Sequence, residues 1–159
     1  FNKKNIIMIT KNDVVEVQKE WSDGIINIGK AYIRNEDYSE LTNKFIDKLY
    51  AFDLGEVLFK PTLASDVQFR LKRDSALSYF IAGNKDFSED NGFALKGWLD
   101  IIWENASIKI EHEIAIAMGN YYFINETEKL KVEFSFVYKR VENGTLKIIL
   151  HDSHLPYQK

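Results

Sequence analysis

Residues 130–150, LKVEFSFVYKRVENGTLKIIL, decide the fold class of this chain. Apolar and aromatic side chains at 130, 132, 134, 136 and 138 alternate with mostly polar ones, which is typical of a strand that packs one face on a core. Asn143-Gly144 is the strongest short-range signal for a β-hairpin, and it joins this strand to a second one over residues 146–150. The stretch therefore predicts two neighbouring antiparallel strands.

Further strands precede this hairpin. Residues 114–124 predict another strand, followed by a turn at 125–128, and residues 98–110 supply the remaining strand or strands of the sheet. A short strand at 57–60 is closed by Pro61, because proline cannot donate a hydrogen bond to a ladder. The loop at 83–97 is rich in Gly, Asn, Asp and Ser, and loops of this length often cover a functional site.

The first half of the chain has helical periodicity. Apolar residues recur at steps of three and four along one face of a long helix: Val14, Val17, Trp21, Ile25, Ile28 and Tyr32. Asn12 or Asp13 is the expected N-cap of this helix. A second helix carries apolar positions 41, 45 and 49, and a third starts at Asp74 or Ser75. Helices followed by a run of strands predict an α+β fold, with the helices on one face of an antiparallel sheet.

The composition is that of one globular domain of 159 residues, of which 45% are hydrophobic. The formal net charge is −3 and the basic residues are dispersed, which argues against a nucleic-acid partner. No apolar run approaches the roughly 18 residues expected of a membrane span. The chain has no cysteine, which excludes disulfides, thiolate catalysis and zinc–cysteine sites.

The chain begins at Phe1 rather than Met, so we expect a trimmed or mature form, or one unit of a longer protein. Residues 1–12 are expected to form a flexible or trimmed segment ahead of the domain. The sequence leaves the compartment open, and removal of a targeting peptide would fit an organellar or periplasmic location.

Groups able to handle protons gather in the tail, residues 151–157 (HDSHLPY), directly after the last predicted strand. Catalytic residues are often placed where a rigid scaffold meets a loop. A second polar cluster lies upstream, in KPT at 60–62 and SY at 78–79. These segments would form one site if the fold brings them together around a pocket.

Five short motifs, in this order, carry a resemblance to one protein family. They are FKPTL at 59–63, ALSYF at 76–80, GFALK at 92–96, AMGNYYF at 117–123 and HDSHLP at 151–156. Over residues 14–157 the chain resembles the metal-free, iota-class carbonic anhydrases, which are related to the calcium/calmodulin-dependent kinase II association domain. The resemblance implies a cystatin-like, nuclear-transport-factor-2-like cone. In this cone, a single domain over residues 1–159, N-terminal helices pack on a strongly curved antiparallel sheet.

The resemblance also implies a function. Iota-class enzymes are lyases that hydrate carbon dioxide reversibly to bicarbonate, here without a metal or other cofactor. Hydroxyls of a Thr, a Tyr and a Ser are implied to hold bicarbonate inside the cone. Carried across by motif, these are Thr62, Tyr79 and the tail serine, Ser153.

The tail departs from the family pattern, His-His-Ser-Ser-x-Pro, at Asp152 and His154. A regular strand continued from positions 146, 148 and 150 would put Asp152 and His154 inside the cone, while His151 and Ser153 point away. A bulge near Asp152 would reverse this and bring Ser153 in. We favour the regular strand, in which Asp152 or His154 accepts the proton released by the reacting water. His154 then joins the catalytic set, and His154→Ala should lower turnover steeply.

The same residues have purely structural interpretations. Thr62 could cap a turn after Pro61, and Tyr79 could be a core aromatic residue whose hydroxyl reaches the surface. His151 and His154 form an H-x-x-H pair, which is a common spacing for metal ligands. Residues three apart on a strand point to opposite faces, however, and this disfavours a metal site.

Two classes of function therefore remain. One is a metal-independent carbonic anhydrase, and the other is a catalytically degenerate binding or oligomerisation module of the same fold. A pocket-facing Ser153 favours the enzyme, whereas a pocket-facing His154 favours the module or an altered substrate. Such domains pair through the open face of the sheet, where Val137 and Ile149 offer apolar surface. We expect a homodimer in either class.

Overall fold

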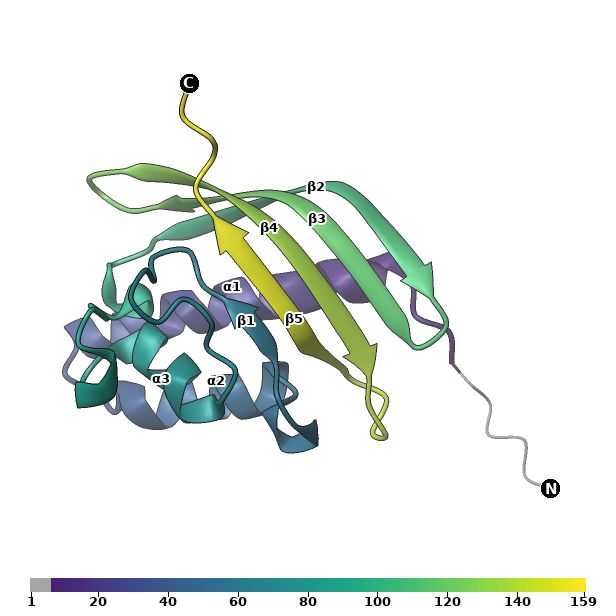
Figure 1. Cartoon of the computed structure of the whole chain (residues 1–159), viewed down its shortest axis with the longest axis horizontal. Helices are drawn as coiled ribbons and strands as arrows, with labels where there is room; N and C mark the ends of the chain where they lie inside the picture. The colour runs from purple at the N-terminus through teal and green to yellow at the C-terminus, as the bar shows by residue number, and fades with distance from the viewer. Residues whose placement is uncertain (1–6) are drawn as a thin grey trace.

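Helices α1 (Lys11–Ile33), α2 (Tyr38–Leu49) and α3 (Arg73–Ile81) lie on one side of a curved sheet, as Figure 1 shows. This computed structural model describes residues 7–159. Its five strands are β1 (Leu58–Lys60), β2 (Asp100–Glu111), β3 (Ile114–Ile124), β4 (Lys129–Arg140) and β5 (Leu146–His154). Three short 3-10 turns complete the elements: η1 (Phe52–Leu54), η2 (Lys85–Phe87) and η3 (Phe93–Leu95). The predicted α+β class, with helices on one face, is confirmed.

The strand order is β1-β5-β4-β3-β2. The four long strands pair antiparallel, as predicted, but β1 pairs with β5 in parallel, so the sheet is mixed. Leu58, Phe59 and Lys60 lie opposite Leu150, His151 and Asp152 in that parallel pair. This pairing brings the upstream polar cluster beside the tail, although the two are far apart in sequence.

Helix α1 packs its periodic apolar face against the concave side of the sheet (Figure 1). Tyr32 is an exception to the predicted inward face, because 45% of its surface is exposed at the end of the helix. The N-cap is Thr10 rather than Asn12 or Asp13: its hydroxyl accepts from the Asp13 N–H, and the Asp13 carboxylate accepts from the Thr10 N–H at 2.7 Å. Residues 11 and 12 therefore belong to the helix, and residues 1–6 of the expected flexible segment lie outside the described residues.

A β-bulge interrupts the pairing of β4 with β5 just before the tail. Val137 pairs with Leu150, but the next residue, Tyr138, pairs with Ile148, so Ile149 is the extra residue on β5. The predicted turn at Asn143-Gly144 does join the two strands; the Gly144 N–H donates to the Val141 carbonyl at 2.8 Å, and Gly144, rather than Asn143, has a positive φ of 84°. Beyond the bulge, the residues of β5 change face.

A second irregularity bends the opposite edge of the sheet. The pairing of β2 with β3 shifts between Asn105 and Ser107, and Gly119 lies opposite the shift. A Cβ atom on Gly119 would overlap the carbonyl oxygen of Glu104 and the backbone of Asn105, so no larger residue fits there. The side chains of Gln18 and Asn105 pair through two reciprocal hydrogen bonds of 2.8 Å, which tie α1 to the bend.

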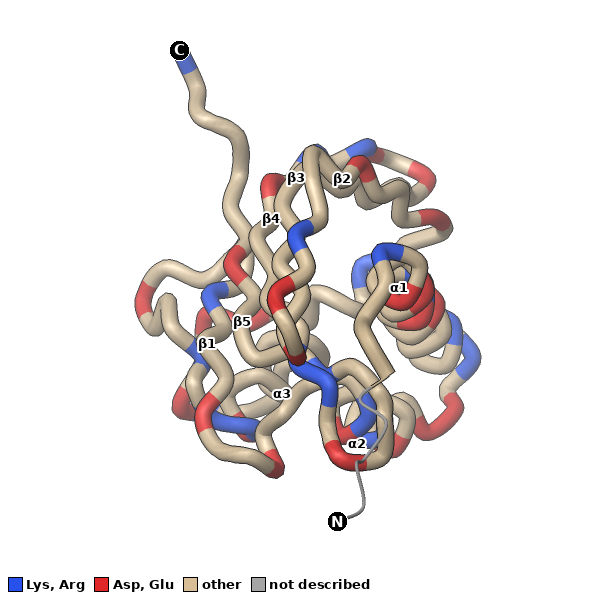
Figure 2. Tube along the Cα trace, turned by 90° about the vertical axis from the view of Figure 1, so that its right-hand side faces the viewer, with Lys and Arg blue, Asp and Glu red and all other residues tan. Residues whose placement is uncertain are grey.

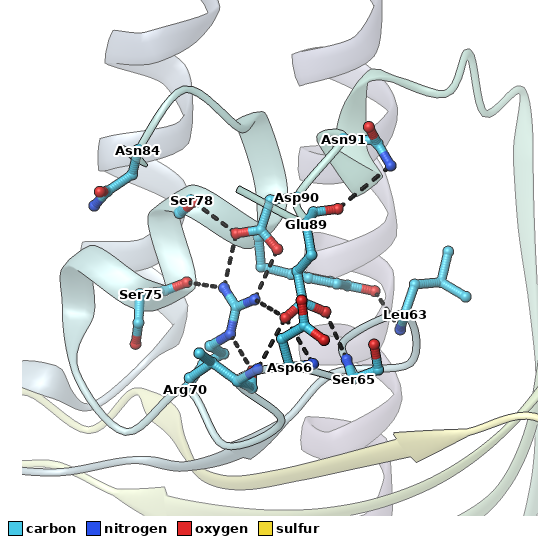
Figure 3. Close-up of polar contacts among 12 residues, drawn as sticks. Leu63, Ser65, Asp66, Arg70, Ser75, Ser78, Asn84, Glu89, Asp90 and Asn91 are labelled. Carbon is cyan, nitrogen blue, oxygen red and sulfur yellow. Dashed lines mark hydrogen bonds and ion pairs between the residues drawn. The ribbon is translucent and has the colours of Figure 1, made fainter. Parts of the chain in front are cut away.

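Two loops close one end of the fold, and a buried ion pair joins them (Figure 3). Arg70, from the loop after β1, binds Asp90 of the loop after α3 through bonds of 2.7 and 2.8 Å, and both side chains are fully buried. Ser78 donates to the same carboxylate at 2.6 Å. The neighbouring Glu89 accepts from the backbone N–H groups of residues 65, 66 and 67 at 2.6–2.9 Å. These bonds hold the 83–97 loop against the loop after β1.

Charged side chains are spread along the trace, with Lys and Arg interspersed among Asp and Glu (Figure 2). Within residues 7–159, no helix combines the length and the apolar character that a membrane crossing demands.

Candidate active site

A small cavity lies between the concave face of the sheet and the two closing loops. The centre of a water-sized sphere can move within about 10 Å³ of this cavity, which is roughly the space that one water molecule needs. Rings and hydroxyls line it: Trp21, Phe59, Pro61, Thr62, Tyr79, Phe80, Phe93, Tyr121, His151 and Ser153. The two polar clusters singled out in the sequence therefore meet around one space.

Local sequence explains how Thr62 and Tyr79 reach the cavity. Pro61 ends the pairing of β1 with β5, so the chain leaves the sheet at Thr62. Helix α3 carries Tyr79 on its buried side, where the hydroxyl accepts from the Leu63 N–H at 3.4 Å. Thr62 remains half-buried, whereas Tyr79 is buried. Thr62 is therefore the cavity residue that is most exposed to solvent.

The prediction for the tail was wrong in its direction. His151 and Ser153 are buried, with 3% and 0% of their surface exposed, while Asp152 is half-buried on the other face and His154 is exposed. The regular-strand argument failed because β5 carries its bulge at Ile149, three residues before the expected position. One inserted residue moves every later side chain to the opposite face.

His154 and Asp152 lie on the convex face of the sheet, with the strand between them and the cavity. The His154 Nε2 atom is 3.1 Å from a carboxylate oxygen of Glu133, and its Nδ1 atom is 3.6 Å from Asp152. About half of the His154 side chain is exposed. Neither residue lines the cavity, so a direct proton transfer from the reacting water to either of them has no geometric support.

Ser153 belongs to a buried hydrogen-bond network that reaches back into α1. Its hydroxyl contacts the hydroxyl of Tyr121 and lies 2.9 Å from His151 Nε2. His151 Nδ1 is 2.9 Å from the Tyr50 hydroxyl, which accepts from Trp21 Nε1–H at 2.9 Å. The network orders the Ser153 side chain from behind.

Tyr121 is the cavity residue that sequence reasoning missed. It was part of the AMGNYYF motif but received no role, and the structure puts its hydroxyl between His151 and Ser153. A signal was present: Ala115, Ala117 and Phe123 alternate on the buried face of β3, and Tyr121 shares their parity. A tyrosine on a buried strand face requires a hydrogen-bonding partner.

Burial keeps the cavity electrically neutral near pH 7. It raises the pKa of the Tyr79 hydroxyl well above its usual value, and it does the same to the pKa of Tyr121. Burial also lowers the pKa of His151 well below 6.5, so its imidazole stays uncharged. The cavity therefore offers neutral hydrogen-bond donors rather than charges.

A second, shallow depression lies beside this cavity. Tyr79 and Phe93 line both spaces, whereas Leu63 and Lys96 line only the depression. By the same measure of volume, the depression is about 40 Å³.

Two other features of the described residues point away from alternative sites. A larger groove of about 400 Å³ lies between α1 and α2, but it is open and presents exposed charged residues such as Lys44 and Lys48, without converging hydroxyls. Across residues 7–159, no three His, Asp or Glu side chains gather in a way that could hold a metal ion.

Comparison with known proteins identifies the family. A sequence model described as metal-independent carbonic anhydrase matches residues 12–155. A metal-independent carbonic anhydrase from Nostoc sp. is 38% identical over 155 residues, which are 95% of this chain and 76% of that protein.

Solved structures agree with this match. The iota-carbonic anhydrase from a cyanobacterium, complexed with bicarbonate, superposes with a TM-score of 0.93 at 35% identity, covering 99% of both chains. A nuclear-transport-factor-2-like protein of unknown function from Shewanella oneidensis superposes with a TM-score of 0.56 at 14% identity, covering 92% of this chain and 99% of its own, and supports the fold alone. This chain belongs to the metal-independent carbonic anhydrase family.

Proposed function

We propose that this chain hydrates carbon dioxide reversibly to bicarbonate, as a lyase of the carbonate dehydratase type, and that the hydroxyls of Thr62, Tyr79 and Ser153 hold the oxygens of the ligand. One observation carries the proposal: these three hydroxyls, from three distant segments, line the same buried cavity in a chain of this family. The bicarbonate bound by the cyanobacterial relative supports a small-molecule substrate of this class.

The cavity suits the chemistry of the reactants. Carbon dioxide is neutral and apolar, and aromatic rings such as Phe59 and Phe93 form most of the wall. Because the cavity has room for about one water, we propose that the ligand enters by an outward shift of the Thr62-Leu63 segment. Holding water beside the substrate carbon replaces a bimolecular encounter by an oriented reaction.

Hydroxyl donors then act on the charge that develops. The oxygen of water attacks the carbon, one carbon–oxygen π bond breaks, and negative charge accumulates on an oxygen of the former carbon dioxide. Tyr79 keeps its proton at neutral pH, because burial raises its pKa, and it can donate to that oxygen. We propose that Thr62 and Ser153 orient the water and the remaining ligand oxygen.

The proton released by water must leave the cavity. No carboxylate lines the cavity within residues 7–159, and His151 is buried with a pKa lowered by that burial. We therefore propose that the proton passes to solvent water and buffer on the side of Thr62, which is the partly exposed hydroxyl. Product formation balances as one bicarbonate and one proton for each carbon dioxide and water.

The orientation of the tail also bears on the second class of function. A non-catalytic module was favoured by a pocket-facing His154, and an enzyme by a pocket-facing Ser153. Ser153 is fully buried against the cavity and His154 is outside it, which supports the enzyme.

Stopped-flow measurement of carbon dioxide hydration, before and after exhaustive chelation, tests the function. Activity should survive chelation and fall on the order of 100-fold in Thr62→Ala, Tyr79→Phe and Ser153→Ala, because each variant deletes one preorganised donor. Ser22→Ala is the matched control, since Ser22 is a buried serine that bonds Gln18 and Trp103 outside the cavity. An inactive but folded chain would point to the binding module, and three fully active variants would refute the hydroxyl roles.

We further propose that the chain forms a homodimer through the convex face of the sheet. Ile116 and Met118 are exposed there, at 39% and 55%, and Ile116 lies opposite Val137 on the neighbouring strand. Ile149, at the bulge, packs partly against the core and contributes less than expected. Sedimentation velocity should report a dimer that Met118→Lys dissociates, with Lys30→Glu, at an exposed position of α1, as control; a monomeric wild type would exclude the dimer.

A further inference from the structure

The hydrogen bonds behind the cavity run in a single line from Trp21 to Ser153. Trp21 Nε1 is 2.9 Å from the Tyr50 hydroxyl, and that hydroxyl is 2.9 Å from His151 Nδ1. On the other side of the imidazole, Nε2 is 2.9 Å from Ser153 Oγ and 3.0 Å from the Tyr121 hydroxyl. All five side chains are buried. Because these groups are buried, the number of protons that each one carries fixes which group donates in each hydrogen bond.

Trp21 sets the direction at one end. An indole N–H can donate but not accept, so the Tyr50 oxygen must accept from it. The remaining proton of Tyr50 has one partner within the described structure, His151 Nδ1. If Nδ1 carried a proton instead, the Tyr50 proton would be left without an acceptor in the core, which folded proteins avoid. Nδ1 is consequently the acceptor.

His151 must then carry its proton on Nε2. Its ring is stacked between Phe59 and Phe136, with ring centroids 4.7 and 4.0 Å away, and burial in these apolar surroundings lowers its pKa and keeps it neutral. A neutral imidazole has one proton, and with Nδ1 accepting, that proton is on Nε2. The Nε2–H group donates toward the Ser153 and Tyr121 oxygens.

The tautomer decides what the cavity offers to a ligand. The hydroxyls of Ser153 and Tyr121 together carry two protons. One proton lies in the hydrogen bond between the two oxygens, and the other needs a different acceptor. Since Nε2 already donates, it cannot accept that second proton, and both hydroxyls border the cavity. In the opposite tautomer, Nε2 would take the second proton and the pair would present only acceptors.

We propose that Trp21 and Tyr50 fix the Nε2–H tautomer of His151 and thereby make the Ser153–Tyr121 pair present one O–H donor to an oxygen of the ligand. Tyr50 and His151 are then positioning residues, and Tyr121 joins Ser153 as a cavity hydroxyl. The inference deepens the proposed function and rests on it. Its chemical consequence is a donor aimed in advance at the oxygen on which negative charge develops.

Nitrogen-15 NMR of the imidazoles tests the direction without any reference to activity. In the wild-type chain, His151 should show the neutral Nε2–H signature throughout about pH 5 to 8, where an ordinary exposed histidine titrates. Assignment follows from the signals that disappear in His154→Ala and His112→Ala. A neutral Nδ1–H signature, or a His151 that titrates in this range, would overturn the proposal.

Tyr50→Phe tests the consequence for the ligand. This variant removes the donor to Nδ1, so the Nδ1–H tautomer should become populated and kcat should fall by about tenfold or more, with little change in KM. Tyr138→Phe is the matched control, because Tyr138, on β4, is buried as fully as Tyr50 and does not line the cavity. It should lose comparable stability while keeping the wild-type tautomer and kcat.

The outcomes separate the two claims. A shifted tautomer with unchanged kcat in Tyr50→Phe would refute the donor role, while the hydroxyl site of the proposed function would stand. A wild-type chain without hydration activity would refute the proposed function, and the NMR signature of His151 would still decide the direction of the network.

Discussion

The imidazole of His151 stacks on the ring of Phe136, with the ring centroids 4.0 Å apart and the planes inclined by 21°. The two residues are direct partners across β4 and β5, on the concave face of the sheet. This contact places His151 in the core, and Ser153, two residues further along the same face, at the cavity. The polar tail is therefore oriented by packing of the strand before it.

His154→Ala should leave carbon dioxide hydration within about twofold of the wild-type rate. The His154 imidazole lies on the convex face beside Glu133 and Asp152, where it contacts no cavity residue. An exposed ion pair of this kind contributes little, so stability should also change little. Stopped-flow kinetics in buffers of low and high capacity check the rate; a steep loss would restore His154 as the proton acceptor.

Acid should destabilise the chain through His151. The pKa of His151 is lowered in the folded state by burial, so below about pH 6.5 the unfolded chain binds a proton that the folded chain does not. Stability conferred by the neutral ring is thus present above that pH and falls as the pH drops, by up to about 1.4 kcal/mol per pH unit. Urea denaturation at several pH values should show a steeper loss for wild type than for His151→Gln; equal slopes would contradict the assignment.

Leu63→Trp should slow access to the cavity. Leu63 follows the cavity residue Thr62 and lines the depression beside the cavity, and 40% of its surface is exposed, so a larger ring can cover this side of the cavity without disturbing the core. The expected result is a several-fold decrease in kcat/KM at unchanged thermal stability. Phe69→Trp, an exposed position of the same loop, is the control and should behave like wild type; identical kinetics of the two variants would place access elsewhere.

Asp90→Asn should destabilise the chain by up to about 3–5 kcal/mol, because it removes the bidentate partner of the buried Arg70 guanidinium and leaves only the Glu89 carboxylate, 4.0 Å away. The exposed pair of Lys19 with Asp23 provides the comparison, and Asp23→Asn should cost less than about 1 kcal/mol. Chemical denaturation measures both. Equal losses of stability in the two variants would mean that the Arg70–Asp90 pair is not desolvated, contrary to its full burial.

Ala82→Gly should stabilise the chain by about 1 kcal/mol. Ala82 ends α3 with φ of 59° and ψ of −167°, a region that glycine adopts readily and alanine does not. Thermal unfolding of the variant measures the net gain, from which the added freedom of glycine in the unfolded chain has already been subtracted. A loss of stability would show that the entropic effect exceeds the strain.

The regular elements could be predicted because their signals are local. The three-and-four spacing of Val14, Val17 and Trp21 indicates α1, and Asn143-Gly144 specifies its hairpin, irrespective of the rest of the chain. The motif that contains Thr62 and the motif that contains Tyr79 were enough to nominate two cavity hydroxyls. Tyr121 received no role, because its hydroxyl matters only through His151 and Ser153, which belong to another strand.

The sequence by itself determined the order and type of the elements, the net charge of −3 and its dispersion along the chain, and the family resemblance carried by five motifs. The tertiary structure decided which face of the tail meets the cavity, because strand periodicity is reversed by a single bulged residue, and only cross-strand pairing places that residue at Ile149. It also decided the parallel docking of β1 on β5 and the burial of Arg70 against Asp90. These contacts join segments far apart in the chain, and their energies depend on the packing of the whole domain rather than on any local pattern.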